Sequence, residues 1–403
     1  MSSTSETTPA APPAAHPSLR VLGVYAASRV LTTAILLACF LLAPTLRLPF
    51  GSARAATGFL HFLAAWDGTA YRQIALHGYP TTLPVDAAGH VLPNAWAFLP
   101  LYPALVRAIM AATGSGSADS FDVVAVLVSL LAGAGAAVVL HRLLQRTTTP
   151  RAALWGTVLF CVGPLSFVLQ VAYAESLFLL LLFGALLALR ADRLLPFTLL
   201  AVAASATRPG ALVLGVALLV HSVMGWRDKR RRSGRSPAGS RVVSVLLSGA
   251  TIGAAGLAWP VIAGAVTGHP DAYVQTELAW WTGYVGRPGL VPFAPWLLMA
   301  TRYLGPLGVV LVVAVWGLAV VLLTRRAVRA LGPEVLGFSV AHLAYLAAVF
   351  LPQQSLPRLL LPLAPVLGAA PLSETPRRRG LLLGIAVALQ IPAVLLLWVI
   401  GYP

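Results

Sequence analysis

The sequence predicts an all-helical protein that crosses a membrane many times. Of its 403 residues, 58% are hydrophobic and only 10% are charged, and the mean hydropathy is +0.84. Soluble domains carry about 25% charged residues, so this chain lacks the polar residues that would cover two or three water-soluble domains. Its net charge of +16 comes from short basic runs between apolar stretches. That pattern indicates cytoplasmic loops at a membrane, and we expect no nucleic-acid partner.

Eleven apolar segments are candidates for membrane spans. The first 18 residues contain no apolar run and are rich in Ser, Thr, Pro and Ala, so they predict a disordered tail. Residues 19–403 then form a single transmembrane domain. The predicted spans are residues 20–43, 121–140, 152–170, 173–190, 194–207, 209–226, 242–266, 303–324, 334–352, 358–372 and 380–400.

The basic residues predict the orientation of these spans. Nineteen of the 28 Lys and Arg residues fall on the predicted cytoplasmic side, where Arg20 follows a cytoplasmic N-terminus and the other 18 lie in five loops that alternate correctly. These loops are 141–151, 190–193, 227–241, 325–329 and 377–379. The opposite face then holds a first outer loop of about 44–120 and a second of about 267–302. We expect a multi-pass protein of the plasma membrane whose active site is extracytoplasmic.

Two segments depart from the simple pattern. The apolar stretch 95–112 would invert every later loop if it spanned, and Pro100 and Pro103 prevent a straight helix. We therefore assign it to the outer surface as an interfacial or re-entrant segment. The span 194–207 is short and ends at Arg208, which is followed by Pro and Gly. Broken helices at membrane depth need a packed or watery environment, so this break indicates a nearby functional cavity.

Acidic residues are rare here, so their positions are informative. Asp67 lies early in the first outer loop, on a predicted helix that the residues 78–80 (Gly-Tyr-Pro) would end. One side of that helix carries Phe62, Leu63, Trp66, Ala70, Ile74 and His77. Glu175 lies directly before an unbroken apolar run, where a carboxylate is costly unless it pairs or lines a cavity. It is a candidate site residue or a structural partner for a nearby Arg.

Arg208 and Arg358 are the basic counterparts of these carboxylates. Each adjoins a proline at the outer end of a predicted span, where an isolated Arg can also be only a snorkelling anchor. The topology rests on the cytoplasmic loops alone, yet Asp67, Glu175 and both arginines fall on the outer side. Because the planar guanidinium fork suits phosphate, these four residues predict a site for an anionic, hydroxyl-rich ligand.

Two weaker patterns lie in the outer loops. His61, His77 and His90 share the first loop with Asp67 and Asp86, but their spacing matches no standard metal site. We expect no cofactor and no divalent metal. The second loop is rich in aromatic residues, which either stack on a sugar or belong to an interfacial aromatic belt, the interpretation we favour. These aromatic residues are Trp280, Trp281, Tyr284 and Trp296.

The outer-loop motifs resemble those of one family. The first outer-loop signature of the GPI mannosyltransferase 2 (PIG-V-like) family is similar to WDGTAYRQIALHGY at 66–79. Its aromatic-Pro-Leu-Tyr-Pro motif resembles AFLPLYP at 97–103. Its Tyr-Ser-Glu-Ser element resembles YAESLF at 173–178, with Ala174 in place of the first Ser. Its Arg-containing turn resembles TRPG at 207–210, and the motifs keep the family's order.

This resemblance implies a membrane glycosyltransferase of the GT-C fold with a polyprenyl-phosphate-linked mannose donor. In that fold an acidic residue of the first outer loop is the usual catalytic base, a role that carries over to Asp67. Lys229 is the only lysine, which indicates a GC-rich genome and hence a bacterium. Bacteria lack GPI anchors, so the family's acceptor does not carry over. We expect a glycan, glycolipid or protein acceptor, and mannose is the default among hexoses.

The residue types fit this reaction independently of the resemblance. Inverting transfer needs a carboxylate that accepts the proton of the acceptor hydroxyl, which Asp67 would supply. The lipid phosphate leaves as a stabilised anion, so Arg208 or Arg358 would bind it and stabilise its charge. Glu175 would orient the acceptor or hold an arginine. Weaker candidates for sugar contact are Trp66, Tyr71 and Tyr102, with structural packing as the alternative.

Two other functional classes stay open. A transporter or lipid flippase would also have many spans and charges within the membrane, but it predicts charges near the midplane and an internal repeat. The sequence has no evident repeat, and its key charges gather at one rim. A non-catalytic subunit of a glycan-assembly complex is the other alternative, and it would be favoured if Asp67 proved dispensable.

Overall fold

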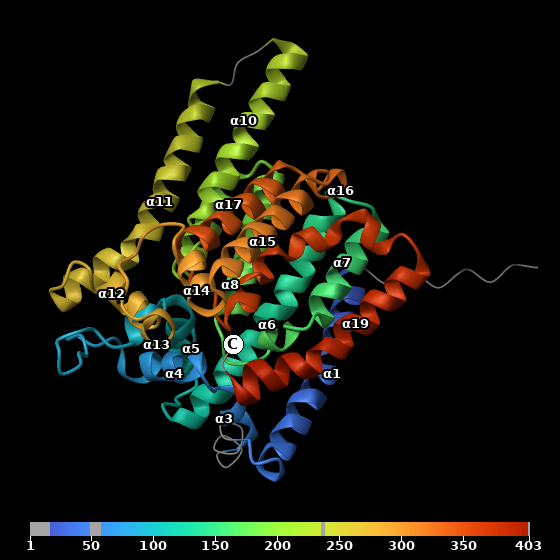
Figure 1. Ribbon diagram of the computed structural model, residues 1–403. Coiled ribbons are helices and arrows are strands. Elements are labelled where there is room, and N and C mark those ends of the chain that lie inside the picture. The colour runs from blue at the N-terminus through green and yellow to red at the C-terminus, as the bar shows by residue number, and fades with distance from the viewer. Residues whose placement is uncertain (1–16, 49–57, 235–237, 402–403) are drawn as a thin grey trace, which may run out of the picture.

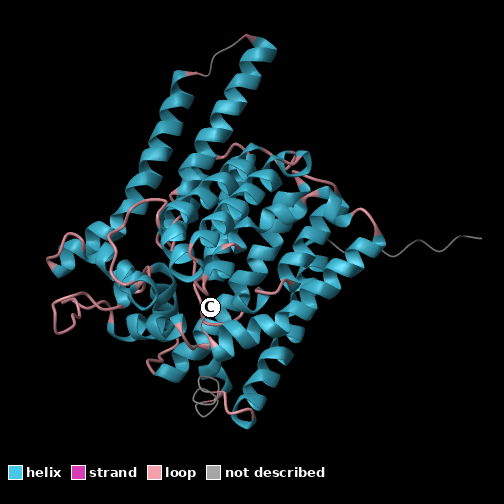
Figure 2. Cartoon of the chain, in the orientation of Figure 1, coloured by secondary structure: helices cyan, strands magenta, loops and turns pink. Residues whose placement is uncertain are grey.

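The structure is a computed structural model, and it describes residues 17–48, 58–234 and 238–401. Within these ranges the chain is helical with no named strand, and the isolated bridge between Val85 and Val91 lies in a loop (Figure 2). This confirms the predicted all-α class. Of the predicted disordered tail, residues 1–16 lie outside the described ranges, while Pro17 and Ser18 belong to the first helix.

Five of the described helices are long and apolar enough to cross a membrane, and each coincides with a predicted span. They are α1 (Pro17–Thr45), α6 (Ala118–Gln145), α11 (Gly239–Thr267), α15 (Pro306–Thr324) and α19 with its π-helical continuation η5 (Pro376–Ile400). Five more predicted spans correspond to shorter or less apolar helices. These are α7 (Pro150–Val162), α8 (Glu175–Arg190), α9 (Leu194–Ser205), α10 (Val213–Ser233) and α17 (Pro333–Val349).

The predicted span 358–372 is not a regular α-helix. It consists of α18 (Leu356–Leu359) and the 3-10 turns η3 (Leu361–Gly368) and η4 (Ala370–Ser373). Four prolines, at 357, 362, 365 and 371, remove the backbone donors that an α-helix would use. The segment packs into the protein against α7, where a Cβ on Gly156 would lie only 2.9 Å from the carbonyl oxygen of Leu367. Irregular backbone is tolerated in such a buried place.

Residues 59–77 of the first outer loop form two helices where the sequence predicted one. α3 (Phe59–Leu63) and α4 (Asp67–His77) are separated at Trp66, whose φ of 58° and ψ of −121° no helix can accommodate. The indole N–H of Trp66 donates to the carbonyl of Trp398 at 3.0 Å and so holds the break in place. α4 ends at Gly78, as predicted, and His77 in its last turn is exposed. The break makes Asp67 the first residue of a helix.

The apolar stretch 95–112 is also divided, as its prolines predicted. After the short turn η1 (Ala95–Ala97), α5 (Leu101–Ala112) begins directly behind Pro100, and Pro103 falls in its first turn. Tyr102, Val106 and Met110 are spaced by four and form its buried side, which packs against α4 and α6. Its position relative to a membrane stays a prediction.

The two outer loops lie together at one end of the molecule. The second contains α12 (Ala272–Ala279), α13 (Thr282–Val285) and α14 (Pro295–Leu304). Figure 1 shows α4, α5, α12 and α13 gathered at the end opposite to α16 (Arg326–Arg329) and the far tip of the α10–α11 hairpin. The basic ends of α10 and α16 are thus separated from the long outer loops, as the charge pattern predicted.

Candidate functional site

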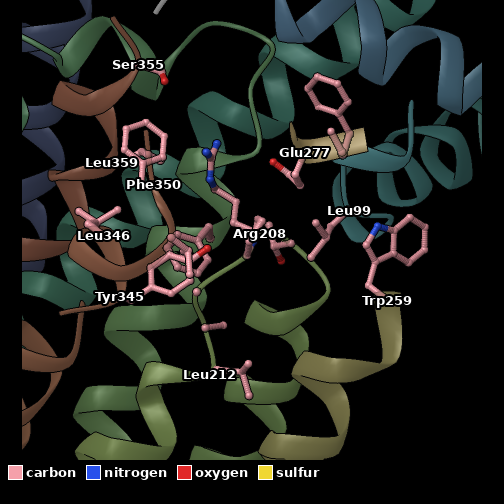
Figure 3. Close-up of a pocket in the computed structure, with 18 of the residues that line it drawn as sticks. Leu99, Arg208, Leu212, Trp259, Glu277, Tyr345, Leu346, Phe350, Ser355 and Leu359 are labelled. Carbon is pink, nitrogen blue, oxygen red and sulfur yellow. The ribbon is translucent and has the colours of Figure 1, made fainter. Parts of the chain in front are cut away.

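A cavity of about 430 Å³ lies beneath the two outer loops. Asp67, Glu175, Arg208 and Arg358 all line it, although they are as many as 291 residues apart in the chain. Figure 3 shows the Arg208 side chain projecting into this space, with Glu277 on one side and Tyr345 on the other. The lining includes five apolar residues that we call the apolar wall, namely Leu212, Leu257, Pro260, Leu346 and Phe350.

Local structure fixes each of the four charged side chains. Asp67 and Glu175 are the first residues of α4 and α8, where the helix dipole favours negative charge. The backbone N–H of Asp67 also donates to the Tyr173 hydroxyl at 3.3 Å. Arg208 lies in the break between α9 and α10. The break requires glycine at position 210, because its φ is +91° and a Cβ there would lie 2.8 Å from Tyr345.

The four side chains form one continuous charge network. Arg358 pairs with Asp67 and, at 3.3 Å between Nη1 and Oε1, with Glu175, and Arg208 pairs with the same Glu175. The Arg358 guanidinium also lies over the Tyr173 ring, 5.2 Å from its centroid. Side-chain exposure is 20% or less in all four residues. Because burying charges is costly unless they are paired, this alternation of acid and base explains how the network exists inside the protein.

Of the three aromatic residues predicted to contact a sugar, only Tyr71 lines the cavity. Tyr102 is fully buried behind it with ring centroids 5.0 Å apart, and its hydroxyl donates to the carbonyl of Ala125 at 2.9 Å. Its role is therefore to support Tyr71. Trp66 is held by Trp398 and does not line the cavity either. Sugar contact by Tyr102 and Trp66 stays a prediction, and their places outside the cavity lining favour the packing alternative.

Two histidines of the first outer loop, His61 and His90, lie beside carboxylates that are not part of the charge network. His61 and Arg72 both contact Asp122, at 3.1 and 3.0 Å, and His90 lies 3.3 Å from Asp86. Among the residues that the structure describes, no group of three or more His, Cys, Asp or Glu side chains is placed to hold a metal ion. Asp86 also accepts a hydrogen bond from Arg287 at 2.6 Å, and this contact keeps the pKa of its carboxyl well below the usual range.

Sequence reasoning missed Glu277, which lines the cavity from α12 in the second outer loop. Burial raises the pKa of Glu277 to about 7, although a hydrogen bond from Tyr273 and the charge of Arg208 both favour its ionised form. The rarity of acidic residues could have revealed it, as it did for Asp67. Of the aromatic residues noted in this loop, Trp280 and Trp281 line the cavity, whereas the Trp296 indole donates to the carbonyl of Leu346.

Comparison with known proteins identifies the family. Two solved structures of the Archaeoglobus fulgidus oligosaccharyltransferase are similar at 14% identity and a TM-score of 0.44. The first is a complex with Zn and sulfate, and the match covers 83% of this chain and 48% of the chain in that structure. The second is tethered with an acceptor peptide containing the NVT sequon, and the match covers 92% of this chain and 56% of the chain in that structure. The chain thus spans about half the length of these structures, and no curated protein matches it.

Residues 27–259 match the family described as Mannosyltransferase (PIG-V). That match covers more than half of the sequence and includes Asp67, Glu175 and Arg208, so the chain belongs to the mannosyltransferase (PIG-V) family.

Proposed function

We propose that this protein is a membrane glycosyltransferase of the GT-C type, which moves mannose from a polyprenyl-phosphate donor to an acceptor hydroxyl outside the cytoplasm. The observation that carries the proposal is the charge network at the cavity. It places two guanidiniums and two carboxylates beside an apolar wall, and the family match indicates sugar transfer. The acceptor would be a glycan, a glycolipid or a protein.

The donor fits the cavity in two respects. Its phosphate would take a place beside Arg208 and Arg358, where it competes with the carboxylates for the guanidinium forks. Its polyprenyl chain would lie along the apolar wall. Leu257 belongs to that wall and is also 60% exposed on the outside of α11, so the wall continues to the apolar surface of a predicted span. A lipid-linked donor could therefore enter sideways from the bilayer.

Asp67 is the proposed general base. At present its carboxylate is paired with Arg358, but a donor phosphate that binds Arg358 would release it. The acceptor hydroxyl then loses its proton to Asp67 as its oxygen bonds to C1 of the sugar, and the bond from C1 to the phosphate oxygen breaks. Attack opposite to the leaving group inverts the configuration at C1. The leaving phosphate is anionic and needs no proton, and its charge is stabilised by Arg208 and Arg358.

The test compares wild-type protein with Asp67→Asn in detergent. Each is incubated with polyprenyl-phosphate-[14C]mannose and a membrane lipid extract as the acceptor source, with and without EDTA. Asn keeps the size of Asp but accepts no proton, so we expect a loss of about 10²- to 10⁴-fold in label transfer. Asp86→Asn is the matched control, because it changes an outer-loop carboxylate that lies away from the cavity, and it keeps full transfer.

Three outcomes would change the proposal. Equal transfer by Asp67→Asn and wild type would remove Asp67 as the base and make Glu175 the next candidate. Loss of transfer in EDTA would require a metal in the reaction. If wild type moved no sugar from a panel of lipid-phosphate donors, the transferase proposal would fail and the transporter alternative would take its place.

A further inference from the structure

The cavity has a second wall whose chemistry differs from that of the apolar wall. This loop wall consists of Tyr273, Glu277, Trp280 and Trp281, all from α12 and the turn that follows it. It faces the charge network but contains no arginine or lysine. Whereas spanning helices supply most of the apolar wall, the loop wall comes from the second outer loop. The two walls therefore suit different substrates, the apolar wall a lipid chain and the loop wall a polar molecule.

Specific contacts with the first outer loop hold α12 in place. The amide of Asn94 donates to the buried hydroxyl of Thr276 on α12 at 2.9 Å. Next to this contact, the indole N–H of Trp259 on α11 donates to the carbonyl of Trp96 at 2.9 Å, and Ala272 of α12 packs in the same apolar cluster. Tyr79 packs against both tryptophans, with ring centroids 4.8 Å apart in each case. The loop wall is thus a built surface in which Glu277 has a defined position.

Glu277 differs from the other two carboxylates of the cavity in its partners. Asp67 and Glu175 are ion-paired, whereas in the described part of the chain Glu277 is hydrogen-bonded by Tyr273 and has no ion-pair partner. With a pKa of about 7 it is partly protonated near neutral pH, so it can both donate and accept hydrogen bonds. Such a group next to indole rings matches a sugar, which presents hydroxyls at its edge and C–H groups on its face.

We propose that Glu277, Trp280 and Trp281 form the subsite for the acceptor sugar, and that Glu277 positions this sugar through hydrogen bonds to its hydroxyls. The inference rests on the proposed function and assigns the acceptor side of the same site. The donor phosphate belongs at the arginines, because they supply the positive charge that the loop wall lacks. An acceptor from outside the membrane reaches the loop wall without crossing the path of the donor lipid.

The first experiment separates donor use from acceptor use. Glu277→Ala and Glu277→Gln are assayed for transfer at increasing amounts of lipid extract and saturating donor, and for slow release of mannose to water without extract. In Glu277→Ala we expect the half-saturating amount of extract to rise about tenfold, the effect of losing a hydrogen bond to a polar ligand. In this variant the rate of mannose release to water and the half-saturating donor concentration stay within about twofold of wild type, because Glu277 lies outside the donor site.

Conservative and control variants exclude a merely structural effect. Glu277→Gln keeps the size and the hydrogen-bonding capacity, so it recovers most of the acceptor affinity lost in Glu277→Ala. Gln275→Ala changes an exposed side chain on the same helix outside the cavity, and it behaves as wild type. A rise in the donor requirement, a fall in mannose release to water, or an unchanged extract requirement in Glu277→Ala would each overturn the subsite.

A binding measurement distinguishes failure of the subsite from failure of the proposed function. Methyl α-D-mannoside is titrated while tryptophan fluorescence is recorded, because Trp280 and Trp281 belong to the subsite. We expect a saturable change in wild type and in Asp67→Asn that is weakened about tenfold in Glu277→Ala. Saturable binding without any donor cleavage would contradict the transferase but keep the subsite. Donor cleavage in wild type without a saturable change that depends on Glu277 would contradict the subsite alone.

Discussion

Helix α8 carries a cluster of buried charge at each end, and the two clusters differ in one important respect. Glu175, the first residue of α8, belongs to the charge network at the cavity. Arg190, the last residue, lies 3.3 Å from the fully buried Glu334, which also contacts His221 at 3.5 Å. We call this second group the α17 cluster. It borders no part of the cavity, whereas every member of the charge network does.

The comparison shows that buried charge alone does not identify a functional site. Both clusters contain a glutamate in the first turn of a helix, Glu175 in α8 and Glu334 in α17. Among the described residues, one carboxylate oxygen of each glutamate has no hydrogen-bond partner. What distinguishes the charge network is the open space beside it. A cluster without space can only stabilise the fold, while one that borders a cavity can exchange its internal partners for those of a ligand.

The largest expected difference is between the two arginines. Arg358→Gln removes positive charge where the donor phosphate would leave, so we expect transfer to fall by about 10²- to 10³-fold. Arg190→Gln removes the arginine of the α17 cluster, and transfer by the folded protein stays within about twofold of wild type. Both variants leave a buried carboxylate without its cation, which costs about 3 kcal/mol of stability or more.

Label transfer and thermal unfolding in detergent measure these two effects separately. Because both variants are destabilised, transfer is compared at a temperature where each is fully folded. Comparable loss of transfer in Arg190→Gln would show that the α17 cluster also takes part in the reaction, and the comparison would no longer hold.

Substitution of Glu175 should change the transfer reaction, whereas substitution of Glu334 should not, and the difference should be smaller than that between the two arginines. Glu175→Gln keeps the shape but frees Arg208 and weakens the hold on Arg358, so the donor phosphate meets less competition. We expect the half-saturating donor concentration to fall by about tenfold, because the phosphate no longer competes with the Glu175 carboxylate for the guanidiniums. Glu334→Gln changes stability alone. An unchanged donor requirement in Glu175→Gln would assign that carboxylate a structural role.

A pH measurement tests Glu277, whose pKa burial raises to about 7. Between its ordinary pKa of 4.5 and about 7 the folded protein holds a proton that the unfolded chain has lost. Stability therefore falls as the pH rises through this range, by about 3 kcal/mol at most, and the contribution is constant above it. In Glu277→Gln this decrease disappears. Melting temperatures of wild type and Glu277→Gln are measured from pH 4.5 to 8. An identical dependence on pH in the two proteins would contradict the raised pKa.

The sequence predicted the class of fold and the four members of the charge network, because both depend on strong signals. Apolar segments and basic loops are set by the membrane, and charges are rare enough in this chain to stand out. The break at Trp66 and the 3-10 backbone of 361–373 were not predicted, since they depend on contacts with distant residues such as Trp398 and Gly156. Glu277 was missed because its importance comes from the packing of α12 against the first outer loop.

The smallest expected effect concerns the aromatic pair Tyr71 and Tyr102. The Tyr102 hydroxyl bonds to the carbonyl of Ala125 and to the Ser129 hydroxyl inside the protein, so Tyr102→Phe removes two hydrogen bonds and costs about 2 kcal/mol of stability. Its transfer activity stays within about twofold of wild type, since the ring still supports Tyr71. Tyr71→Ala opens the wall of the cavity and lowers transfer by more than Tyr102→Phe does. Melting temperatures and label transfer for both variants test this order, and a greater loss of transfer in Tyr102→Phe would reverse it and return Tyr102 to the sugar site.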